Sequence, residues 1–131
     1  TDLPHMLTDT KSWEKIVSSM GIKNEDRIIV YDNSDVISSC RCWYNFIYFG
    51  HDPSLVHVLD GGLKKWIKEK KSTVNDLTKT INSDYIANEK KELVKKKKQI
   101  DENININKFK FINSKIKKRI FCDFKGYQRK I

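Results

Sequence analysis

Apolar residues in this chain are concentrated in two short runs with a longer aromatic segment between them. The runs cover residues 28–31 and 56–59, and each is followed by an aspartate. The segment 39–49 is apolar at most positions and long enough for a helix. A strand, a helix-length crossover and a second strand indicate a parallel pair, so the pattern predicts an α/β fold. Because consecutive positions of 28–31 are apolar, we expect that strand to be buried on both faces.

Helical spacing predicts two amphipathic segments outside this unit. Apolar residues recur at i, i+3, i+4 and i+7 over 13–20, and Gly21 ends that helix. A second, lysine-rich helix follows the turn 60–62, whose two glycines suit positive φ. Candidate N-caps of the first helix are Thr8, Asp9 and Thr10, and the apolar face of the second is Leu63, Trp66 and Ile67.

The pattern is weaker beyond residue 68. Residues 68–89 show no convincing period and resemble a linker. We expect a helix over 89–100, a break over 103–107 and a strand over 109–112, and we leave the basic tail unassigned. Two strands and a distant third are few for a covered parallel sheet, so the chain reads as incomplete.

Composition narrows the class of protein. The chain of 131 residues is 38% hydrophobic and 33% charged, and no run approaches the ~18 apolar residues of a membrane span. The beginning of the sequence lacks the pattern of a signal peptide. Three cysteines without framework spacing indicate a reducing compartment, so we expect a cytoplasmic protein that uses no membrane.

The net charge of +9 lies entirely in the C-terminal part. Residues 1–75 hold ten basic and ten acidic residues, whereas residues 76–131 hold sixteen basic and seven acidic ones. Of the 26 basic residues 22 are lysines, and Asn and Ile are also frequent, as AT-rich codons would give. The charge is therefore weak evidence for a nucleic-acid partner.

Several short motifs follow one another along residues 2–70. They are Leu3-Pro4-His5-Met6-Leu7, Val30-Tyr31-Asp32, Arg41 before an aromatic pair, Phe49-Gly50-His51, and Leu59-Asp60-Gly61-Gly62-Leu63-Lys64-Lys65-Trp66. In this order they resemble the two-domain rhodanese family of thiosulfate and 3-mercaptopyruvate sulfurtransferases. The turn of 59–66 is the most specific of them, and a weaker match runs over 93–120.

The resemblance implies a domain arrangement. Residues 1–72 would be the later half of a non-catalytic rhodanese domain, 73–89 a linker, and 90–131 the start of a second, incomplete rhodanese domain. The implied fold is a rhodanese-like parallel sheet with flanking helices, itself incomplete. The early strands of the first domain and the loop with the nucleophilic cysteine would be missing from this truncated form.

The family moves a sulfane sulfur from thiosulfate or 3-mercaptopyruvate, through a cysteine persulfide, to a thiol or to cyanide. By resemblance Asp32 stands at the position of the nucleophile, and a carboxylate cannot carry a persulfide. We therefore expect no catalytic residue, little or no activity of this chain alone, and no cofactor. His5 matches a family motif and is expected to be structural.

Two arginines are candidates for binding the small anionic sulfur donor. Arg41 matches an arginine that the family keeps at the cleft between its domains, where a salt bridge is an equal alternative. Arg119 matches a substrate-binding arginine early in the second domain. Around it, Asn113, Lys115 and Lys118 depart from the family pattern.

The three cysteines have competing interpretations. Cys40 or Cys42 could be a thiolate stabilised by a helix N-terminus and Arg41, but burial as small apolar side chains is favoured. Cys122 lacks a glycine-rich loop, so a nucleophilic role is disfavoured. No His or Cys pair follows at zinc spacing, and we expect no metal site.

Three alternatives to a sulfurtransferase role are open. A non-catalytic module could dock a partner through an exposed sheet edge, for example a complementary chain with the missing half. The chain could be a degraded gene remnant. Lysines 95–98 could bind nucleic acid, but a solvated helix face is favoured, and His51 and His57 have no evident partner in sequence.

Overall fold

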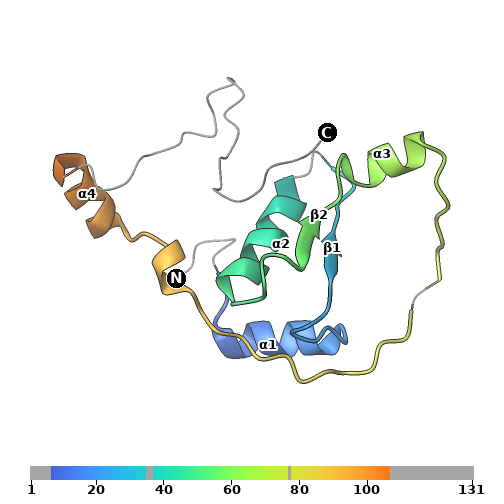
Figure 1. Ribbon diagram of the computed structural model, residues 1–131, viewed down its shortest axis with the longest axis horizontal. Coiled ribbons are helices and arrows are strands. Elements are labelled where there is room, and N and C mark those ends of the chain that lie inside the picture. Colours follow the sequence, from blue (N-terminus) through green and yellow to red (C-terminus); the bar gives the residue numbers. More distant parts are fainter. Residues whose placement is uncertain (1–6, 35–36, 77, 107–131) are drawn as a thin grey trace. The chain divides into compact units, whose positions relative to one another are not determined.

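The computed structural model describes residues 7–34, 37–76 and 78–106. Its contacts divide the chain into two compact units, Thr1–Val94 and Lys95–Ile131. No helix in the described ranges combines the length and apolar character needed to cross a membrane. In the first unit the elements are α1 (Thr10–Ser19), β1 (Ile28–Val30), α2 (Ile37–Tyr48), β2 (Val56–Val58), α3 (Gly62–Lys68) and the 3₁₀ helix η1 (Lys91–Leu93), and the second unit holds α4 (Lys97–Ile106) (Figure 1).

The sheet of the first unit has two parallel strands in the described residues. Ile28 lies opposite Val56, and Val30 lies opposite Val58. Helix α2 is the crossover between them and packs beside both strands (Figure 1). The predicted parallel pair and the α/β class are confirmed.

Aromatic residues from α1 and α2 build the core. Trp13 stacks on Phe49 with ring centroids 4.8 Å apart and meets the edge of Phe46 at 5.1 Å. Val17 of α1 and Val56 of β2 are each 1% exposed and belong to the same core cluster. The dense aromatic run thus holds α1, α2 and the sheet together, because such rings bury a large apolar area.

The predicted N-terminal helix is confirmed as α1, and Asp9 is its N-cap residue among the three candidates. Asp9 accepts hydrogen bonds from the hydroxyl of Ser12 at 2.6 Å and from the backbone N–H of Ser12 at 3.0 Å, and the first of these chiefly lowers the pKa of Asp9. Trp13 and Val17 are buried, as their spacing predicts. The expected apolar face also included Ile16 and Met20, which stay 44% and 52% exposed.

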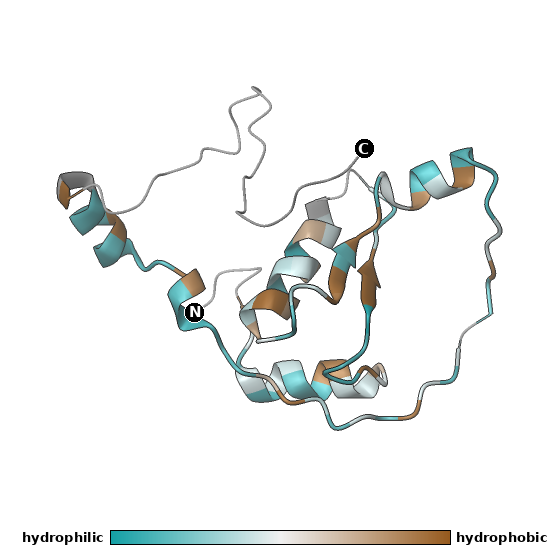
Figure 2. Ribbon diagram, in the orientation of Figure 1, coloured by the Kyte–Doolittle hydropathy of each residue, from teal (hydrophilic) through white to brown (hydrophobic). Residues whose placement is uncertain are grey.

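The expectation that residues 28–31 are buried on both faces is wrong. Ile28 and Val30 pack against the core. Ile29 is 52% exposed and Tyr31 is 58% exposed, because α2 covers only one face of the sheet. Strand β1 is nevertheless apolar throughout, as its brown ribbon shows (Figure 2). One apolar face of β1 is therefore open in the described structure.

Helix α2 is less completely buried than its sequence predicts. It begins at Ile37, two residues before the predicted start, and ends at Tyr48. Phe46 and Tyr48 are buried, but Cys40 and Arg41 in its first half are exposed. The expectation of burial nearly all round is wrong for this half.

Residues 80–90, here called the return segment, run back along α1 (Figure 1). Their backbone is held by α1 and by the end of α2. The N–H groups of Ser83 and Tyr85 donate to the main chain and the side chain of Ser18, both at 3.0 Å. The N–H of Ala87 donates to Glu14 at 2.9 Å. The segment expected to be a linker thus completes the first unit.

The side chains of Asn24 and His51 fix the middle of the return segment. Asn24 donates to the carbonyl of Ile86 at 2.7 Å and accepts its N–H at 2.9 Å. His51 is fully buried, with one ring nitrogen 3.2 Å from the hydroxyl of Tyr85 and the other 3.0 Å from the carbonyl of Asp26. The expectation that His51 has no partner is wrong, and its role is structural.

The C-terminal elements differ from their predictions. In place of one helix over 89–100, the structure has η1, an interruption after it, and α4. Helix α4 continues to Ile106 through asparagines that were expected to break it. The predicted strand 109–112 lies outside the described residues, and the family-based domain boundaries at 72 and 89 stay predictions.

Candidate functional site

The candidate site is the loop after β1, where Asp32 makes the main polar contacts. One carboxylate oxygen accepts the backbone N–H of Ser34 at 3.0 Å, and the other accepts the N–H of Ser39 at 2.8 Å. Ser39 is 1% exposed and belongs to the first turn of α2, where N–H groups have no partner within the helix. The Asp32 carboxylate therefore accepts one N–H of the loop, from Ser34, and one N–H of the helix, from Ser39.

These contacts set the ionisation of Asp32. The hydrogen bond from the Ser39 backbone is the main reason that the pKa of Asp32 falls from 3.8 to about 2. Burial opposes it with the next largest effect, and the hydrogen bond from the Ser34 backbone lowers the pKa further. Asp32 is thus a carboxylate at neutral pH, with two backbone donors holding it in place.

The turn between β2 and α3 closes on the same residue. The N–H of Leu63 donates to the carbonyl of Asp32 at 3.0 Å. Gly62 has φ of +57° and lies so close that a Cβ there would stand 2.8 Å from that carbonyl oxygen. Only glycine suits both demands. The loops after the two strands are therefore joined at Asp32, and the predicted glycine turn is confirmed.

The candidate donor-binding arginines are only partly described. Arg41 lies on α2, two residues after Ser39, and its side chain is exposed. It is thus on the helix whose first turn contacts Asp32. Arg119 and its neighbours Asn113, Lys115 and Lys118 lie outside the described residues, as does His5.

The cysteines near this site have opposite environments. Cys40 is exposed, so the favoured expectation that it is buried is wrong. Cys42 is half-buried, and burial raises the pKa of its thiol, which disfavours a thiolate there. Cys122 lies outside the described residues. Among the residues described, no three His, Cys, Asp or Glu side chains gather in a group that could hold a metal ion.

Sequence reasoning found Asp32 and the glycine turn but missed their contact. It also missed Ser34 and Ser39 as donors. The spacing of Asp32 and Ser34 is a signal for the first of these bonds, because an aspartate commonly accepts the N–H two residues on. No signal pairs Gly62 with Asp32, since only the fold brings the two loops together.

The family described as Rhodanese-like domain matches residues 3–69, which are 67 of the 131 residues and include both strands, α2, α3 and the loop at Asp32. The chain belongs to this family. The predicted rhodanese-like α/β fold is confirmed with it.

Curated relatives of this rhodanese-like chain are named as sulfurtransferases. Thiosulfate/3-mercaptopyruvate sulfurtransferase 1, mitochondrial, of Arabidopsis thaliana is 44% identical over 66 residues, covering 50% of this chain and 17% of the relative. Thiosulfate sulfurtransferase of Bos taurus is 30% identical over 116 residues, covering 87% of this chain and 38% of the relative. 3-Mercaptopyruvate sulfurtransferase of Homo sapiens is 26% identical over 113 residues, covering 85% and 37%. The chain thus spans less than two fifths of the length of these relatives.

Proposed function

We propose that this rhodanese-like chain is a sulfurtransferase-family component that does not carry sulfur itself. The family activity moves a sulfane sulfur from thiosulfate or 3-mercaptopyruvate to a thiol or to cyanide, and the names of the relatives support it. One observation carries the non-catalytic assignment. The Asp32 carboxylate holds the N–H donors of Ser34 and Ser39, where the family resemblance places the persulfide cysteine.

A carboxylate at position 32 cannot act as the sulfur carrier. In transfer from thiosulfate, a cysteine thiolate takes the outer sulfur, forms an S–S bond and releases sulfite, and cyanide then removes that sulfur as thiocyanate. A carboxylate forms no stable bond of this kind. The N–H donors that would stabilise a thiolate at this helix terminus already hold the charge of Asp32.

Arg41, and Arg119 by resemblance alone, remain the proposed contacts for an anionic donor. Arg41 is exposed and on α2, so it is accessible to a small anion. In this proposal the persulfide cysteine comes from elsewhere, either from a complementary chain or from a further part of the same protein. Which of the two donors is used depends on that missing part.

A turnover assay tests the proposal. The full chain is incubated with thiosulfate and cyanide, and thiocyanate is measured against a protein-free blank. We expect no thiocyanate above the blank. Turnover that is lost in Cys40→Ser or in Cys122→Ser would overturn the proposal, because one of those thiols would then be the carrier.

The variant Asp32→Cys tests the donors themselves. Two backbone N–H groups that now hold a carboxylate should stabilise a thiolate, so the new thiol should react with iodoacetamide faster at neutral pH than Cys40 in the same chain. Equal or slower alkylation would show that this loop does not stabilise an anion in the place of Asp32.

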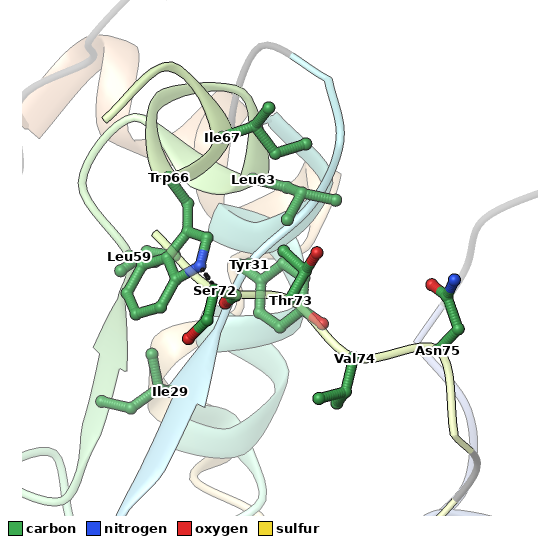
Figure 3. Close-up of a pocket in the computed structure, with 10 residues that line it drawn as sticks. All are labelled: Ile29, Tyr31, Leu59, Leu63, Trp66, Ile67, Ser72, Thr73, Val74 and Asn75. Atoms are coloured by element: carbon green, nitrogen blue, oxygen red, sulfur yellow. Dashed lines mark hydrogen bonds between the residues drawn. The ribbon is translucent and has the colours of Figure 1, made fainter. Parts of the chain in front are cut away.

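A second function, an interaction module, is favoured by the open face of β1. Ile29 of β1 and Tyr31, which follows the strand, are half exposed and line one apolar pocket with residues of α3 (Figure 3), and contiguous apolar surface of this kind marks contacts. Co-purification of a chain with the missing strands and catalytic loop would support this function. Steeply salt-dependent retention on DNA would instead support nucleic-acid binding through residues 90–130.

We also propose a cytoplasmic location, because the three cysteines are odd in number and lack the spacing of a disulfide framework. The Arabidopsis relative is named as mitochondrial, which makes the mitochondrion the competing compartment. Fractionation of cells expressing the tagged full-length protein decides between them, and recovery in mitochondria would contradict the proposal.

A further inference from the structure

His51 is a buried ionisable side chain that joins three parts of the first unit. Its ring is fully buried and lies parallel to the ring of Tyr85 in the return segment, with centroids 5.8 Å apart. It also meets the edge of Phe46 in α2 at 5.7 Å. Because the ring is shielded from bulk water, its two nitrogens must find their hydrogen bonds in the protein. These contacts are internal to the unit, so they do not depend on which of its surfaces are covered.

The partners of the His51 ring fix which nitrogen carries the proton. Nε2 lies 3.0 Å from the backbone carbonyl oxygen of Asp26, and a carbonyl can only accept, so Nε2 donates. Nδ1 lies 3.2 Å from the hydroxyl of Tyr85. In a neutral ring this second nitrogen is an acceptor, so it takes the hydroxyl proton of Tyr85. His51 therefore bonds as a neutral imidazole.

A second donor acts on the hydroxyl of Tyr85. Burial raises the pKa of Tyr85, and the side chain of Trp13, acting as a donor to the same hydroxyl, lowers it. The indole nitrogen of Trp13 is buried and has no hydrogen bond of ordinary geometry within the described part of the chain. The donors thus run in one direction, from Trp13 through Tyr85 to His51 and on to the carbonyl of Asp26.

A proton added at Nδ1 reverses the middle of this chain of donors. The charged ring would donate from both nitrogens, so the oxygen of Tyr85 would face one donor from His51 and one from Trp13. The hydroxyl proton of Tyr85 would lose its acceptor in a residue that is only 3% exposed. An unpaired buried polar group and a buried charge both destabilise a packed state. The closed return segment therefore favours the neutral ring.

The charged groups near His51 offset this effect only in part. The carboxylate of Asp52, next in the chain, attracts a charged ring. Asp52 is exposed, accepts the N–H and the hydroxyl of Ser54 at 2.8 Å each, and also interacts with Lys90. The carboxylate of Asp26 accepts a backbone N–H of its own turn at 2.8 Å. Water and these partners weaken the attraction, and neither carboxylate replaces the acceptor that the buried hydroxyl would lose.

We propose that His51 is a pH-sensitive latch on the return segment. The neutral ring holds Tyr85, and through it residues 80–90, against α1 and the end of α2. Protonation in mildly acidic solution releases Tyr85 and lets the segment open locally. The open form takes up one more proton than the closed form, so the closed form loses stability as the pH falls.

Hydrogen exchange in the full chain tests the latch. The amides of Tyr85 and Ala87 are hydrogen-bonded to α1, so their exchange, corrected for its intrinsic dependence on pH, measures how often the segment opens. In the open form the ring is in water and titrates as histidine ordinarily does, near about pH 6.5. We expect the open population to rise about tenfold between about pH 7.5 and pH 5.5, above the ordinary range of carboxylates.

Two matched variants assign the effect to one histidine. His51→Gln keeps a side-chain N–H for the carbonyl of Asp26 and an acceptor for Tyr85 but takes up no proton, so the rise should vanish. His57→Gln removes a half-buried histidine of β2 and should leave the rise unchanged. In the unsubstituted chain, the ring-nitrogen NMR signals of His51 should show protonation only where the protection of the Tyr85 amide is lost.

Three results would overturn the inference. They are an open population that does not change over this pH range, a rise that persists in His51→Gln or vanishes in His57→Gln, and a protonated His51 ring beneath a Tyr85 amide that is still protected. If His51→Gln does not fold, the ring signals of the unsubstituted chain decide. Thiocyanate turnover would overturn the non-catalytic proposal and leave the latch standing.

Discussion

Both faces of the small sheet carry apolar residues, but one face is buried and the other is exposed. On one face α2 and α1 close over β1 and β2, and Phe49 in that core is fully buried. On the other face Ile29 and Tyr31 remain half exposed and line the apolar pocket. Apolar composition therefore predicts which segments are strands, but not which of their faces is covered.

The largest expected effect separates these faces. Phe49→Ala removes a fully buried ring from the core and should destabilise the fold by about 3–5 kcal/mol. Tyr31→Ala, on the open face, should change the free energy of unfolding by about 0.5 kcal/mol or less. Urea denaturation of both variants measures this. Similar losses would show that the open face is covered in solution.

A smaller effect is expected where α3 meets the sheet. Gly62→Ala combines positive φ with a Cβ 2.8 Å from the Asp32 carbonyl oxygen and should cost about 1–3 kcal/mol. Lys68→Ala, at an exposed position of the same helix, is the matched control and should cost about 0.5 kcal/mol or less. Thermal unfolding of both compares them. Equal midpoints would contradict the close approach of the two loops.

The return segment packs along α1, and the side chain of Asn24 holds it there through Ile86. Asn24→Ala removes both hydrogen bonds to Ile86 and should cost about 1 kcal/mol, because the segment opens more often. Hydrogen exchange at the Ile86 amide should become faster. Asn82→Ala, at an exposed neighbouring position, is the control, and identical exchange in the two variants would count against the segment's role.

The smallest expected effect is on the pH dependence of stability, through Asp32 at the end of β1. Folding lowers the pKa of Asp32 from 3.8 to about 2, so its contribution to stability is complete above the unfolded value and is lost as the pH falls toward 2. Asp32→Asn should therefore flatten the fall in thermal midpoint between about pH 4 and pH 2. Asp76→Asn is the control at an exposed carboxylate. An unchanged acid limb in Asp32→Asn would contradict the assignment.

Local patterns carried most of what could be predicted. The spacing of Trp13 and Val17, the two apolar runs and the glycine turn are signals within a few residues, and they located α1, β1, β2 and α3. The buried His51 and the clamp at Asn24 escaped prediction, because their partners lie 34 and 62 residues away. The open face of β1 escaped for the same reason, since burial depends on which other elements arrive.

The candidate site shows the same limit. The place of Asp32 after a strand was readable, and so was its family resemblance. Its hold on Ser39 depends on how α2 begins, and its contact with Gly62 depends on the second loop. For this reason the sequence located the site but could not show that the N–H groups of Ser34 and Ser39 already hold a carboxylate.

The most direct test of the account is the intact mass of the full chain after incubation with thiosulfate and removal of excess reagent. If Asp32 stands in for the persulfide cysteine, the protein retains its original mass, and Asp32→Cys is the variant in which to look for a gain. A wild-type chain that gains the mass of one sulfur atom, and loses it again with cyanide, would contradict the central claim.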